Sequence, residues 1–334
     1  MAARARATTI AEVARDAGVS PATVSRVMNG HFAGDPEVAE RVRASALALA
    51  YSPNFAARSL ALGSTKAIAF VVPDLANPAF QAMLSGLSKT AAKDGYRVLV
   101  ADSAEVPEDE PELAMEVRRR CDAIVLCAPR MPRAELESIA ESLHPLVLVN
   151  RPDVNVDAPS LSIDYGAGIL ELAEHLRALG HTAFAYLEGP PESVSNAARV
   201  RSLDAFEREH SEVSIARIPC GVNVEDGVAA TQDVVESKAT AVLAFNDLVA
   251  VGLLRGLTDR GIRVPDDISI AGFDDIPYAR YISPPLTTVS VPHSELGVQA
   301  WRRMEALLGS GTPEAGVVFT PRLVARASTA APRL

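Results

Sequence analysis

Residues 9–30, TIAEVARDAGVSPATVSRVMNG, decide the first part of the fold, because they contain the start and end signals of two short helices. Thr9 and Glu12 have the spacing of a capping box, in which a hydroxyl and a carboxylate satisfy the free amides at a helix start. Gly18 ends that helix. The pair Ser20-Pro21 then supplies an N-cap and a proline at the first helical position, where its missing N–H is no loss. Two short helices joined by a tight turn form the helix-turn-helix arrangement.

A third helix is expected to complete this N-terminal unit. The second helix ends at Asn29-Gly30, and Asp35-Pro36 caps a third helix that reaches roughly Ala50. Tyr51-Ser52-Pro53 terminates it, because a residue before proline avoids the helical conformation. The apolar positions of the third helix that are expected to close the core are Val38, Val42, Ala46 and Leu49.

The second helix has the features of a helix that enters the major groove of DNA. In a helix-turn-helix its first turn faces base edges, so Pro21 and Ala22 would lie against bases. Arg26, one turn further on, could reach a guanine or a phosphate. The alternative is that the polar residues only cap the helix and that Arg26 is solvated. The short donors suited to phosphate oxygens are Ser20, Thr23, Ser25 and Asn29.

Length, charge and composition limit the rest of the chain. A length of 334 residues favours two or more domains, and 48% hydrophobic residues exclude disorder over most of it. Residues 1–62 hold seven arginines and five acidic residues, a net charge of +2. Because the whole chain has a formal net charge of −10, the remaining residues have a net charge of −12. A small basic end on an acidic body suits an arm for a polyanion. Three scattered cysteines, and the lack of a signal peptide or a long apolar run, predict a cytoplasmic protein with no membrane partner.

From Lys66 onward short apolar strands alternate with amphipathic helices, which predicts parallel sheets with helices on both faces. The alternation falls into two series of similar size. Two doubly wound halves place a ligand crevice at the carboxyl ends of their strands. The predicted strands are 67–72, 97–101, 123–128, 146–149, 160–163, 183–187, 214–218, 241–244 and 268–272, and the predicted helices are 78–94, 108–120, 133–142, 167–179, 197–209, 225–237 and 247–260.

Polar side chains and aromatic rings follow several of these strands, where the crevice is expected. Carboxylates, amides and an arginine make paired hydrogen bonds to hydroxyls, and an aromatic face covers ring C–H groups, so this set favours a sugar or polyol. Asn246 and Ser195 have an alternative role as helix caps, and one carboxylate of Asp274-Asp275 has an alternative role in tying a hinge. The candidate ligand-binding residues are Asp74, Asn77, Phe80, Asn150, Arg151, Ser195, Arg199, Phe245, Asn246 and Asp274.

Catalytic motifs are not visible in the sequence. Gly166-Ala167-Gly168 lacks the third glycine of a dinucleotide fingerprint, and Gly63-Ser64-Thr65-Lys66 lacks the spacing of a phosphate loop. The six histidines show no HExxH-type pairing, and no GxSxG elbow occurs. We therefore predict no catalytic residue, no metal site and no cofactor.

Residues 9–30 resemble the headpiece of the LacI/GalR family of bacterial transcription regulators, and residues 51–60, YSPNFAARSL, resemble its hinge helix. The similarity continues at 272–275 (GFDD) and 285–289 (PLTTV), and covers essentially the whole chain. It implies an α/β fold: an N-terminal all-α helix-turn-helix headpiece and a two-lobed, periplasmic-binding-protein-like body of doubly wound parallel sheets. It also implies a sequence-specific DNA-binding regulator, expected to be a repressor, whose operator affinity a small-molecule effector controls.

The resemblance also implies a domain organisation in which the chain crosses between the two lobes three times. A homodimer is the expected assembly, since the last residues, Arg333-Leu334, follow no apolar heptads of a tetramer-forming coil. The expected domains are a headpiece at 1–53, a hinge helix at 54–62 and an effector-binding and dimerisation domain at 63–334, with an N-lobe of about 66–162 and 293–320 and a C-lobe of about 163–291 and 321–330.

The hinge helix would act as a switch. Residues 54–62 form only two helical turns, too few for an isolated helix, so they should fold only against DNA or a partner subunit. By the resemblance Leu60 wedges into the minor groove and Ala57 packs close to its symmetry mate. Ala61 stands where the family usually has a basic residue, which puts one phosphate contact in question. A flexible linker with an incidental leucine is the alternative. The predicted DNA-binding residues are Thr9, Ser20, Pro21, Ala22, Thr23, Ser25, Arg26, Asn29, Tyr51, Asn54, Ala57, Arg58 and Leu60.

By family position Arg199, Asn246 and Asp274 are expected to contact ligand hydroxyls. Many members place a tryptophan in the second half of the cleft, whereas Trp301 of this chain lies on a late helix far from that position. The expected partners are double-stranded operator DNA, a sugar, polyol or sugar phosphate effector, and a second copy of the chain. Two other classes are the alternatives: a sugar-binding receptor or transport component that uses the same two-lobed body, and a sugar-metabolising enzyme. Because Trp301 lies far from the cleft position, aromatic stacking on the effector is expected to fall to Phe80, Phe245 or Tyr278.

Overall fold

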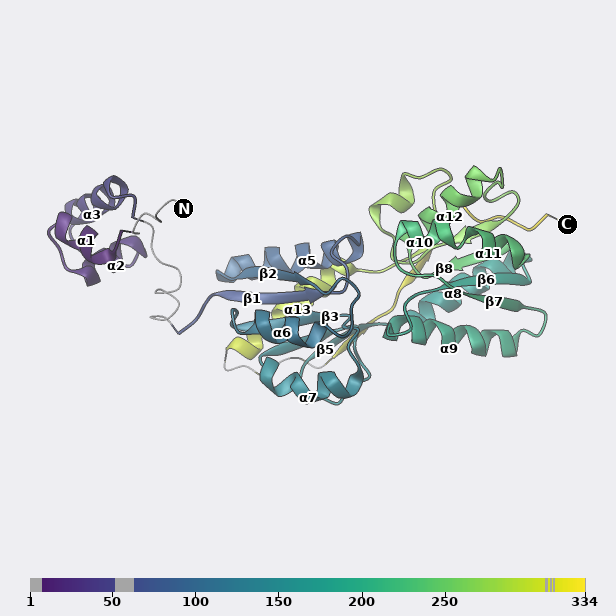
Figure 1. The fold of residues 1–334 in the computed structure, drawn as a ribbon, viewed down its shortest axis with the longest axis horizontal. Helices are drawn as coiled ribbons and strands as arrows, with labels where there is room; N and C mark the ends of the chain where they lie inside the picture. Colours follow the sequence, from purple (N-terminus) through teal and green to yellow (C-terminus); the bar gives the residue numbers. More distant parts are fainter. Residues whose placement is uncertain (1–7, 52–62, 310–311, 313, 315, 334) are drawn as a thin grey trace, which may run out of the picture. The chain divides into compact units, whose positions relative to one another are not determined.

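The computed structural model describes residues 8–51, 63–309, 312, 314 and 316–333, which fall into two compact units (Figure 1). The first unit is Met1–Thr65 and the second is Lys66–Leu334. The first is entirely helical in its described part, and the second, called the body below, alternates strands and helices. The fold class is therefore the predicted one, an α/β body with a helical N-terminal unit.

Helices α1 (Ile10–Asp16), α2 (Pro21–Met28) and α3 (Pro36–Ala48) form the first unit. Their starts confirm the predicted caps. The Thr9 backbone amide donates to the Glu12 carboxylate over 2.7 Å, and the Glu12 backbone amide donates to the Thr9 hydroxyl over 3.4 Å. Gly18 turns the chain with φ +67°, a value that glycine adopts without strain. The Ser20 hydroxyl then accepts a hydrogen bond of 3.2 Å from the amide of Thr23.

A small apolar core holds the three helices together. It contains the predicted Val42 and Ala46, but Val38 is only half-buried, and its neighbour Ala39 faces the core instead. Helix α3 also ends two residues earlier than expected. The buried apolar residues of this core are Val13, Ala14, Ala17, Val24, Val27, Ala39, Val42 and Ala46.

The first lobe of the body is a parallel sheet with strand order β11-β5-β4-β3-β1-β2. Successive residues of β1 point to opposite faces, and both faces are buried. Ile68 and Phe70 face α5 and α13, whereas Ala69 and Val71 face α6 and α7. The elements of this lobe are β1 (Ala67–Val72), α5 (Pro78–Ala91), η1 (Ala92–Asp94), β2 (Arg97–Asp102), α6 (Glu110–Arg118), β3 (Ala123–Cys127), α7 (Arg133–Leu143), β4 (Leu146–Val149), β5 (Ser160–Ile163), α13 (His293–Leu308) and β11 (Val317–Phe319).

The second lobe is a parallel sheet with strand order β7-β6-β8-β9. Helices α8 and α9 cover one face and α11 and α12 the other, so both lobes have the predicted three-layer form (Figure 1). The elements of this lobe are α8 (Tyr165–Ala178), β6 (Ala183–Glu188), α9 (Val194–Glu209), β7 (Ser214–Pro219), α10 (Val224–Ala229), α11 (Thr231–Glu236), β8 (Ala241–Ala244), α12 (Asp247–Asp259) and β9 (Ser269–Ala271).

Two helix predictions in this lobe are wrong in detail. The single helix expected at 225–237 is broken at Ala230 into α10 and α11, and the Thr231 hydroxyl bonds back to the Val228 carbonyl at the break. The helix expected from residue 197 begins at Val194, because Ser193 caps it by accepting from the Asn196 amide. The second correction moves Ser195 into the first turn of α9.

Three stretches carry the chain between the two lobes, near 163–165, 290–293 and 319–322. Two short strands, β10 (Thr288–Ser290) and β12 (Arg322–Val324), pair antiparallel beside them. The 3-10 helix η2 (Pro277–Arg280) precedes β10. Neither this pair of strands nor η2 was predicted from the sequence.

Candidate functional site

Helix α2 presents a polar, exposed first turn. Pro21, Ala22 and Arg26 are exposed, while Val24 and Val27 on the opposite side are buried in the core. The Arg26 Nε makes only a long hydrogen bond of 3.4 Å, to the Ala22 carbonyl of its own helix. This arrangement leaves the first turn of α2 and the Arg26 guanidinium accessible to a partner.

The short polar residues around this turn are partly engaged with one another. The Ser20 and Thr23 hydroxyls lie 3.0 Å apart, and the Asn29 amide donates to the Ser25 hydroxyl over 3.3 Å. Ser20 both caps α2 and is exposed, so its role as a helix cap does not exclude the predicted contact with a phosphate. Thr9 also caps, and its exposed hydroxyl donates to Glu12 over 2.9 Å.

The other predicted DNA-binding residues lie at the end of this unit. Tyr51 is half-buried, and burial raises the pKa of its hydroxyl. The hinge residues Asn54, Ala57, Arg58 and Leu60 lie outside the described residues, as does Ala61.

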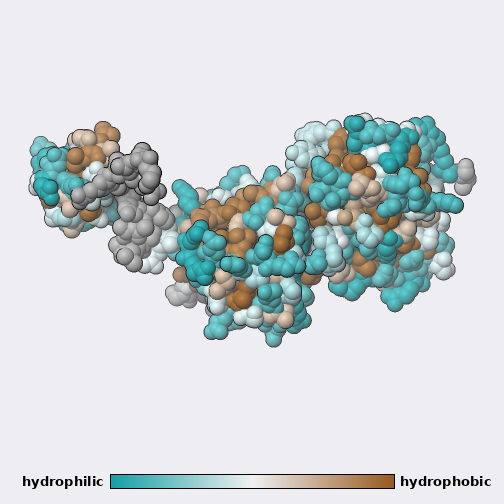
Figure 2. Space-filling model, in the orientation of Figure 1, coloured by the Kyte–Doolittle hydropathy of each residue, from teal (hydrophilic) through white to brown (hydrophobic). Residues whose placement is uncertain are grey.

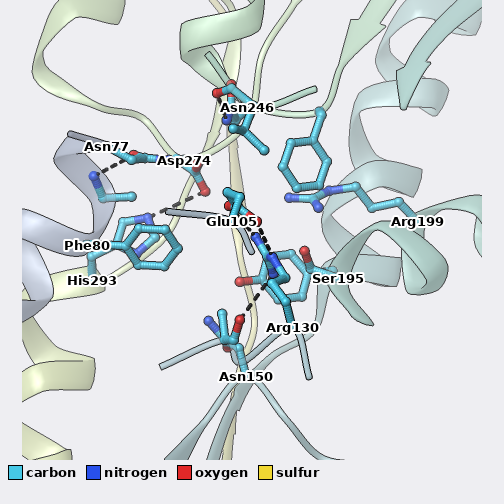
Figure 3. A pocket seen from close by; sticks show the side chains of 15 residues that line it. Asn77, Phe80, Glu105, Arg130, Asn150, Ser195, Arg199, Asn246, Asp274 and His293 are labelled. Carbon is cyan, nitrogen blue, oxygen red and sulfur yellow. Dashed lines mark hydrogen bonds and ion pairs between the residues drawn. The ribbon is translucent and has the colours of Figure 1, made fainter. Parts of the chain in front are cut away.

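A cavity opens between the two lobes of the body (Figure 3). Its walls come from the carboxyl ends of strands in both lobes and from the crossing segments, which is where the crevice was expected. The predicted ligand-binding residues that line it are Asn77, Phe80, Asn150, Ser195, Arg199, Phe245, Asn246 and Asp274.

Arg199 projects from α9 into this cavity and is only 2% exposed. Its guanidinium carbon lies 4.0 Å from the centre of the Phe273 ring, 4.5 Å from that of Tyr165 and 4.8 Å from that of Phe245. Nε and Nη1 are buried and have no hydrogen-bond partner among the described residues. A buried guanidinium without polar partners is costly, so Arg199 carries an unmet hydrogen-bonding demand on the wall of this cavity.

The amides that line the cavity have structural roles as well. Asn246 caps α12: its Oδ1 accepts from the Val249 amide and its Nδ2 donates to the Val222 carbonyl, both over 2.8 Å. Asn77 caps α5 by accepting from the Ala79 amide over 2.9 Å. The cap alternative therefore holds for Asn246, and it fails for Ser195, which is not an N-cap in the structure.

The two carboxylates of Asp274-Asp275 are divided between cavity and hinge. Asp275 pairs with Arg326 and Arg280, so it ties the crossing segments together. Asp274 lines the cavity, and its Oδ1 lies 3.5 Å from Nε2 of His293. Both aspartates have positive φ, +110° and +53°, a strained conformation that accumulates at functional sites.

Two of the predicted residues do not line the cavity. The Asp74 carboxylate closes a local turn by accepting from the Ala76 amide over 2.7 Å, and burial raises its pKa. The buried Arg151 donates to the Pro129 carbonyl over 2.6 Å and pairs with Asp153 at 3.0 Å. Both follow strand ends, but their side chains are used to hold loops.

Four polar or aromatic lining residues were not predicted: Glu105, Arg130, Tyr165 and His293. Glu105 and Arg130 form a two-contact ion pair, with Nε–Oε2 at 2.6 Å and Nη2–Oε1 at 2.9 Å. Each follows the end of a strand, β2 or β3, so the strand-end rule alone would have included them. Tyr165 likewise follows β5, whereas His293 carried no such signal.

A buried carboxylate holds the loop of Arg130 in place. Glu110 is 1% exposed, and its Oε2 accepts from the backbone amides of Arg130 and Met131 over 2.6 and 2.7 Å. Burial raises the pKa of Glu110, although these hydrogen bonds oppose the shift. The position of Arg130 is thus determined by two carboxylates, one through its side chain and one through its backbone.

Comparisons with known proteins extend over the whole chain. Residues 9–54 match the family described as "Bacterial regulatory proteins, lacI family", and residues 173–329 match "Periplasmic binding protein-like domain". The transcriptional regulator GalR of Salmonella typhimurium (strain SL1344) is 33% identical over 331 residues, 97% of this chain and 96% of the relative.

Solved structures give the same result. The lac repressor dimer bound to operator and the anti-inducer ONPF matches with a TM-score of 0.84 and 27% identity, over 98% of this chain and 100% of that one. A LacI family regulator from Enterococcus faecium with bound ribose matches with a TM-score of 0.69 and 26% identity, over 80% of this chain and all of that chain.

No helix in the described part of the chain has both the length and the apolar character needed to span a bilayer. The relatives are DNA-binding transcriptional regulators and not enzymes, which removes the sugar-metabolising enzyme and the transport receptor from consideration. With a third of its residues identical to GalR along nearly its entire length, the chain belongs to the LacI family of bacterial transcriptional regulators.

Proposed function

We propose that this regulator is a repressor that binds operator DNA as a homodimer, and that a sugar or polyol in the cavity controls its operator affinity. The observation that carries the proposal is Arg199, a buried arginine without polar partners that projects into a cavity between two lobes. In a chain that also has a helix-turn-helix, such a cavity serves to sense a small molecule. Residues 1–53 would be the headpiece, 54–62 the hinge and 63–334 the body.

Two headpieces would occupy successive major grooves roughly 34 Å apart on a pseudo-palindromic operator. The exposed first turn of α2 supports this role, since Pro21 and Ala22 are free to lie against base edges and Arg26 is free to reach a guanine or a phosphate. The operator complex of the lac repressor, which resembles this chain along its length, also supports it.

Leu60 would insert into the minor groove when residues 54–62 become helical against DNA and the partner subunit. Effector binding would shift the two lobes and so favour or disfavour that ordering. As a test, Leu60→Ala should weaken specific operator binding and leave effector binding unchanged. Equal operator affinity in the two proteins would contradict the wedge.

The effector would lie among the polar residues of both lobes, with Arg199 and Asp274 as its principal hydrogen-bonding partners. Phe80 and Phe245 line the same space and offer apolar faces to ring C–H groups. The E. faecium regulator with bound ribose supports a sugar-sized ligand.

Exposed apolar residues support a homodimer through the body. Leu99 and Val100 of β2, at an edge of the first sheet, are 40% and 38% exposed, and Tyr281 is 84% exposed. Figure 2 shows hydrophobic side chains gathered over the region of α5 and β2. An unpaired strand edge with apolar side chains is a surface that another chain covers. A Val100→Glu protein that is as dimeric as the wild type by light scattering would argue against this surface.

The central experiment measures operator binding and its response together. Gel shifts with the DNA upstream of the protein's own gene should give a specific complex, and a panel of sugars should change its affinity. A strictly monomeric protein, or one that binds all duplexes equally at moderate salt, would refute the proposed function.

A further inference from the structure

Lys66 is the first residue of the body, and the chain reaches it from the predicted hinge at 54–62. Its backbone has φ +50°, a left-handed conformation that most residues other than glycine avoid. Such a conformation persists only where the surrounding contacts impose it. The direction in which the chain leaves the body is therefore set by the contacts of Lys66.

The first sheet holds both backbone groups of Lys66. Its amide donates to Oδ2 of Asp122, just before β3, over 2.9 Å. Its carbonyl accepts from the amide of Arg97, the first residue of β2, over 2.9 Å. The amide of Asp122 donates in turn to the Ala67 carbonyl over 2.8 Å. These bonds fix the backbone of Lys66 between the starts of three neighbouring strands.

The side chain of Lys66 lies on the ring of Tyr96. Its Nζ is 4.4 Å from the centre of that ring and donates to the Tyr96 hydroxyl over 3.3 Å. The negative face of an aromatic ring attracts an ammonium group, so this contact is favourable even though Lys66 is exposed. The contact holds an otherwise mobile side chain in one direction, and with it the residue at which the chain enters the body.

Trp301 of α13 supports the ring of Tyr96. The two ring centres lie 5.1 Å apart, and Nε1 of Trp301 donates to Oδ2 of Asp94 over 2.7 Å. Trp301 is only 1% exposed, so its position follows that of α13. Helix α13 packs so closely on α5 that a Cβ at Gly297 would lie 2.0 Å from the Met83 carbonyl oxygen. The ring of Tyr96 therefore rests on a rigid pair of helices.

We propose that four residues of the body, called the exit clamp below, are positioning residues for operator binding, because they fix the direction in which the chain leaves the body toward residues 54–62. A fixed exit presents the hinge segment in one orientation, so less conformational entropy is lost when the specific complex forms. Non-specific binding depends on phosphate contacts and needs no such orientation. The inference rests on the proposed operator binding. The residues of the exit clamp are Lys66, Tyr96, Trp301 and Asp94.

Lys66→Ala in the full-length protein opens the clamp and keeps the backbone bonds of that residue. Its affinity for the DNA upstream of the protein's own gene should fall about tenfold, because a dimer loses two cation–π contacts, each worth a few-fold. Its affinity for a scrambled duplex of the same length should not change. Lys93→Ala, which removes the same charge from an exposed position in η1, should leave both affinities unchanged. Fluorescence anisotropy at moderate salt measures all four.

Substitutions of Tyr96 test whether the two residues act through one contact. Tyr96→Phe keeps the ring and should retain most of the specific affinity, whereas Tyr96→Leu should lose as much as Lys66→Ala. The double variant with Lys66→Ala and Tyr96→Leu should lose no more than either single variant, since one contact can be removed only once. Circular dichroism and the emission of Trp301, the only tryptophan, verify the fold, and light scattering verifies the dimer.

An unchanged specific affinity in Lys66→Ala would overturn the assignment. So would an equal loss on the specific and the scrambled duplex, because Lys66 would then act through its charge. Additive losses in the double variant would also overturn it. Each of these results leaves the proposed function standing as long as the wild type prefers the upstream DNA. A wild-type protein without that preference would instead refute the proposed function itself, so the two failures are distinguishable.

Discussion

The hydroxyl of Thr288 donates a hydrogen bond of 2.6 Å to Oδ1 of Asp247, which joins β10 to the first turn of α12. Oδ2 of the same carboxylate accepts from the Ile276 amide over 2.8 Å. Through these two hydrogen bonds the completely buried Asp247 connects the second lobe, the crossing strand and the turn that carries Asp274. This relationship explains how a strained turn with two positive φ values keeps Asp274 on the wall of the cavity.

Replacing Asp247 with asparagine should change how stability depends on pH. Burial, and then the nearby charge of Asp274, raise the pKa of Asp247 well above its ordinary 3.8. A carboxyl with a raised pKa in the folded state loses stabilising free energy as pH rises from its unfolded value through its folded value. The neutral Asp247→Asn side chain avoids this loss. Relative to wild type, the variant should therefore gain stability as the pH rises above about 4, measured by urea unfolding.

Thr288→Val is the matched control, since it removes the hydroxyl and keeps the size of the side chain. It leaves the Asp247 oxygen without a donor and should lower the free energy of unfolding by about 1–3 kcal/mol. A stability difference between wild type and Asp247→Asn that does not vary with pH would contradict the raised pKa.

Gly252→Ala should strongly destabilise the second lobe. A Cβ at Gly252 would lie 1.9 Å from the Val224 carbonyl oxygen, which is backbone and cannot move aside without separating α10 from α12. Overpacking of this kind costs about 1–3 kcal/mol, which a urea midpoint resolves easily. At Gly166 the atom met at 2.6 Å is the Ser202 hydroxyl, which can rotate away, so Gly166→Ala should cost much less. Equal losses in the two variants would contradict the close packing of α10 on α12.

Local signals in the sequence predicted the local structure well. Thr9, Ser20 and Asp35 cap the three N-terminal helices as expected, because capping depends on residues only two or three positions apart. Short apolar runs predicted the strands of both sheets for the same reason, except β11, which is only three residues long. The break at Ala230 was missed, since the sequence of 225–237 contains neither proline nor a terminal glycine that would mark it.

Strand-end position predicts which residues line the cavity, but it does not predict which side chains pair with one another there. Strand-end position identified Asn77 and Asp274, and the family resemblance pointed to Arg199, but neither gave a sign that Arg151 would turn away to bind the Pro129 carbonyl. Glu105 and Arg130 are 25 residues apart and meet only when β2 and β3 lie in one sheet. Pairing across such a distance requires the folded sheet, and no local pattern announces it.

Acid should loosen the C-terminal end of the chain through His181. Its Nδ1 lies 2.8 Å from the Thr240 hydroxyl and its Nε2 lies 2.8 Å from the Ala330 carbonyl, so the ring is satisfied in its neutral form. Burial lowers its pKa below the ordinary 6.5. The folded state then binds a proton less readily than the unfolded state, and stability falls as pH drops through 6.5 toward the folded value.

Urea unfolding at several values between about pH 7.5 and pH 5 measures this effect. His181→Gln keeps a donor and an acceptor but cannot gain a proton, so its stability should decline less over that range than that of the wild type. Parallel pH profiles for the two proteins would show that another group is responsible.

Arg26→Ala should weaken operator binding without destabilising the headpiece. The side chain is exposed and bonds only to a carbonyl of its own helix, so its removal exposes no core and creates no unpaired buried group. If Arg26 binds a guanine, the loss should be about 1–3 kcal/mol and confined to operators that have that base, whereas a phosphate contact would weaken all duplexes alike and reduce the salt dependence.

Arg43, which pairs with Glu40 on the surface of α3, provides the control, because Arg43→Ala removes the same charge from a different helix. Fluorescence anisotropy at several salt concentrations separates these cases. If Arg26→Ala and Arg43→Ala lose the same small affinity on every duplex, α2 makes no base contact through this arginine.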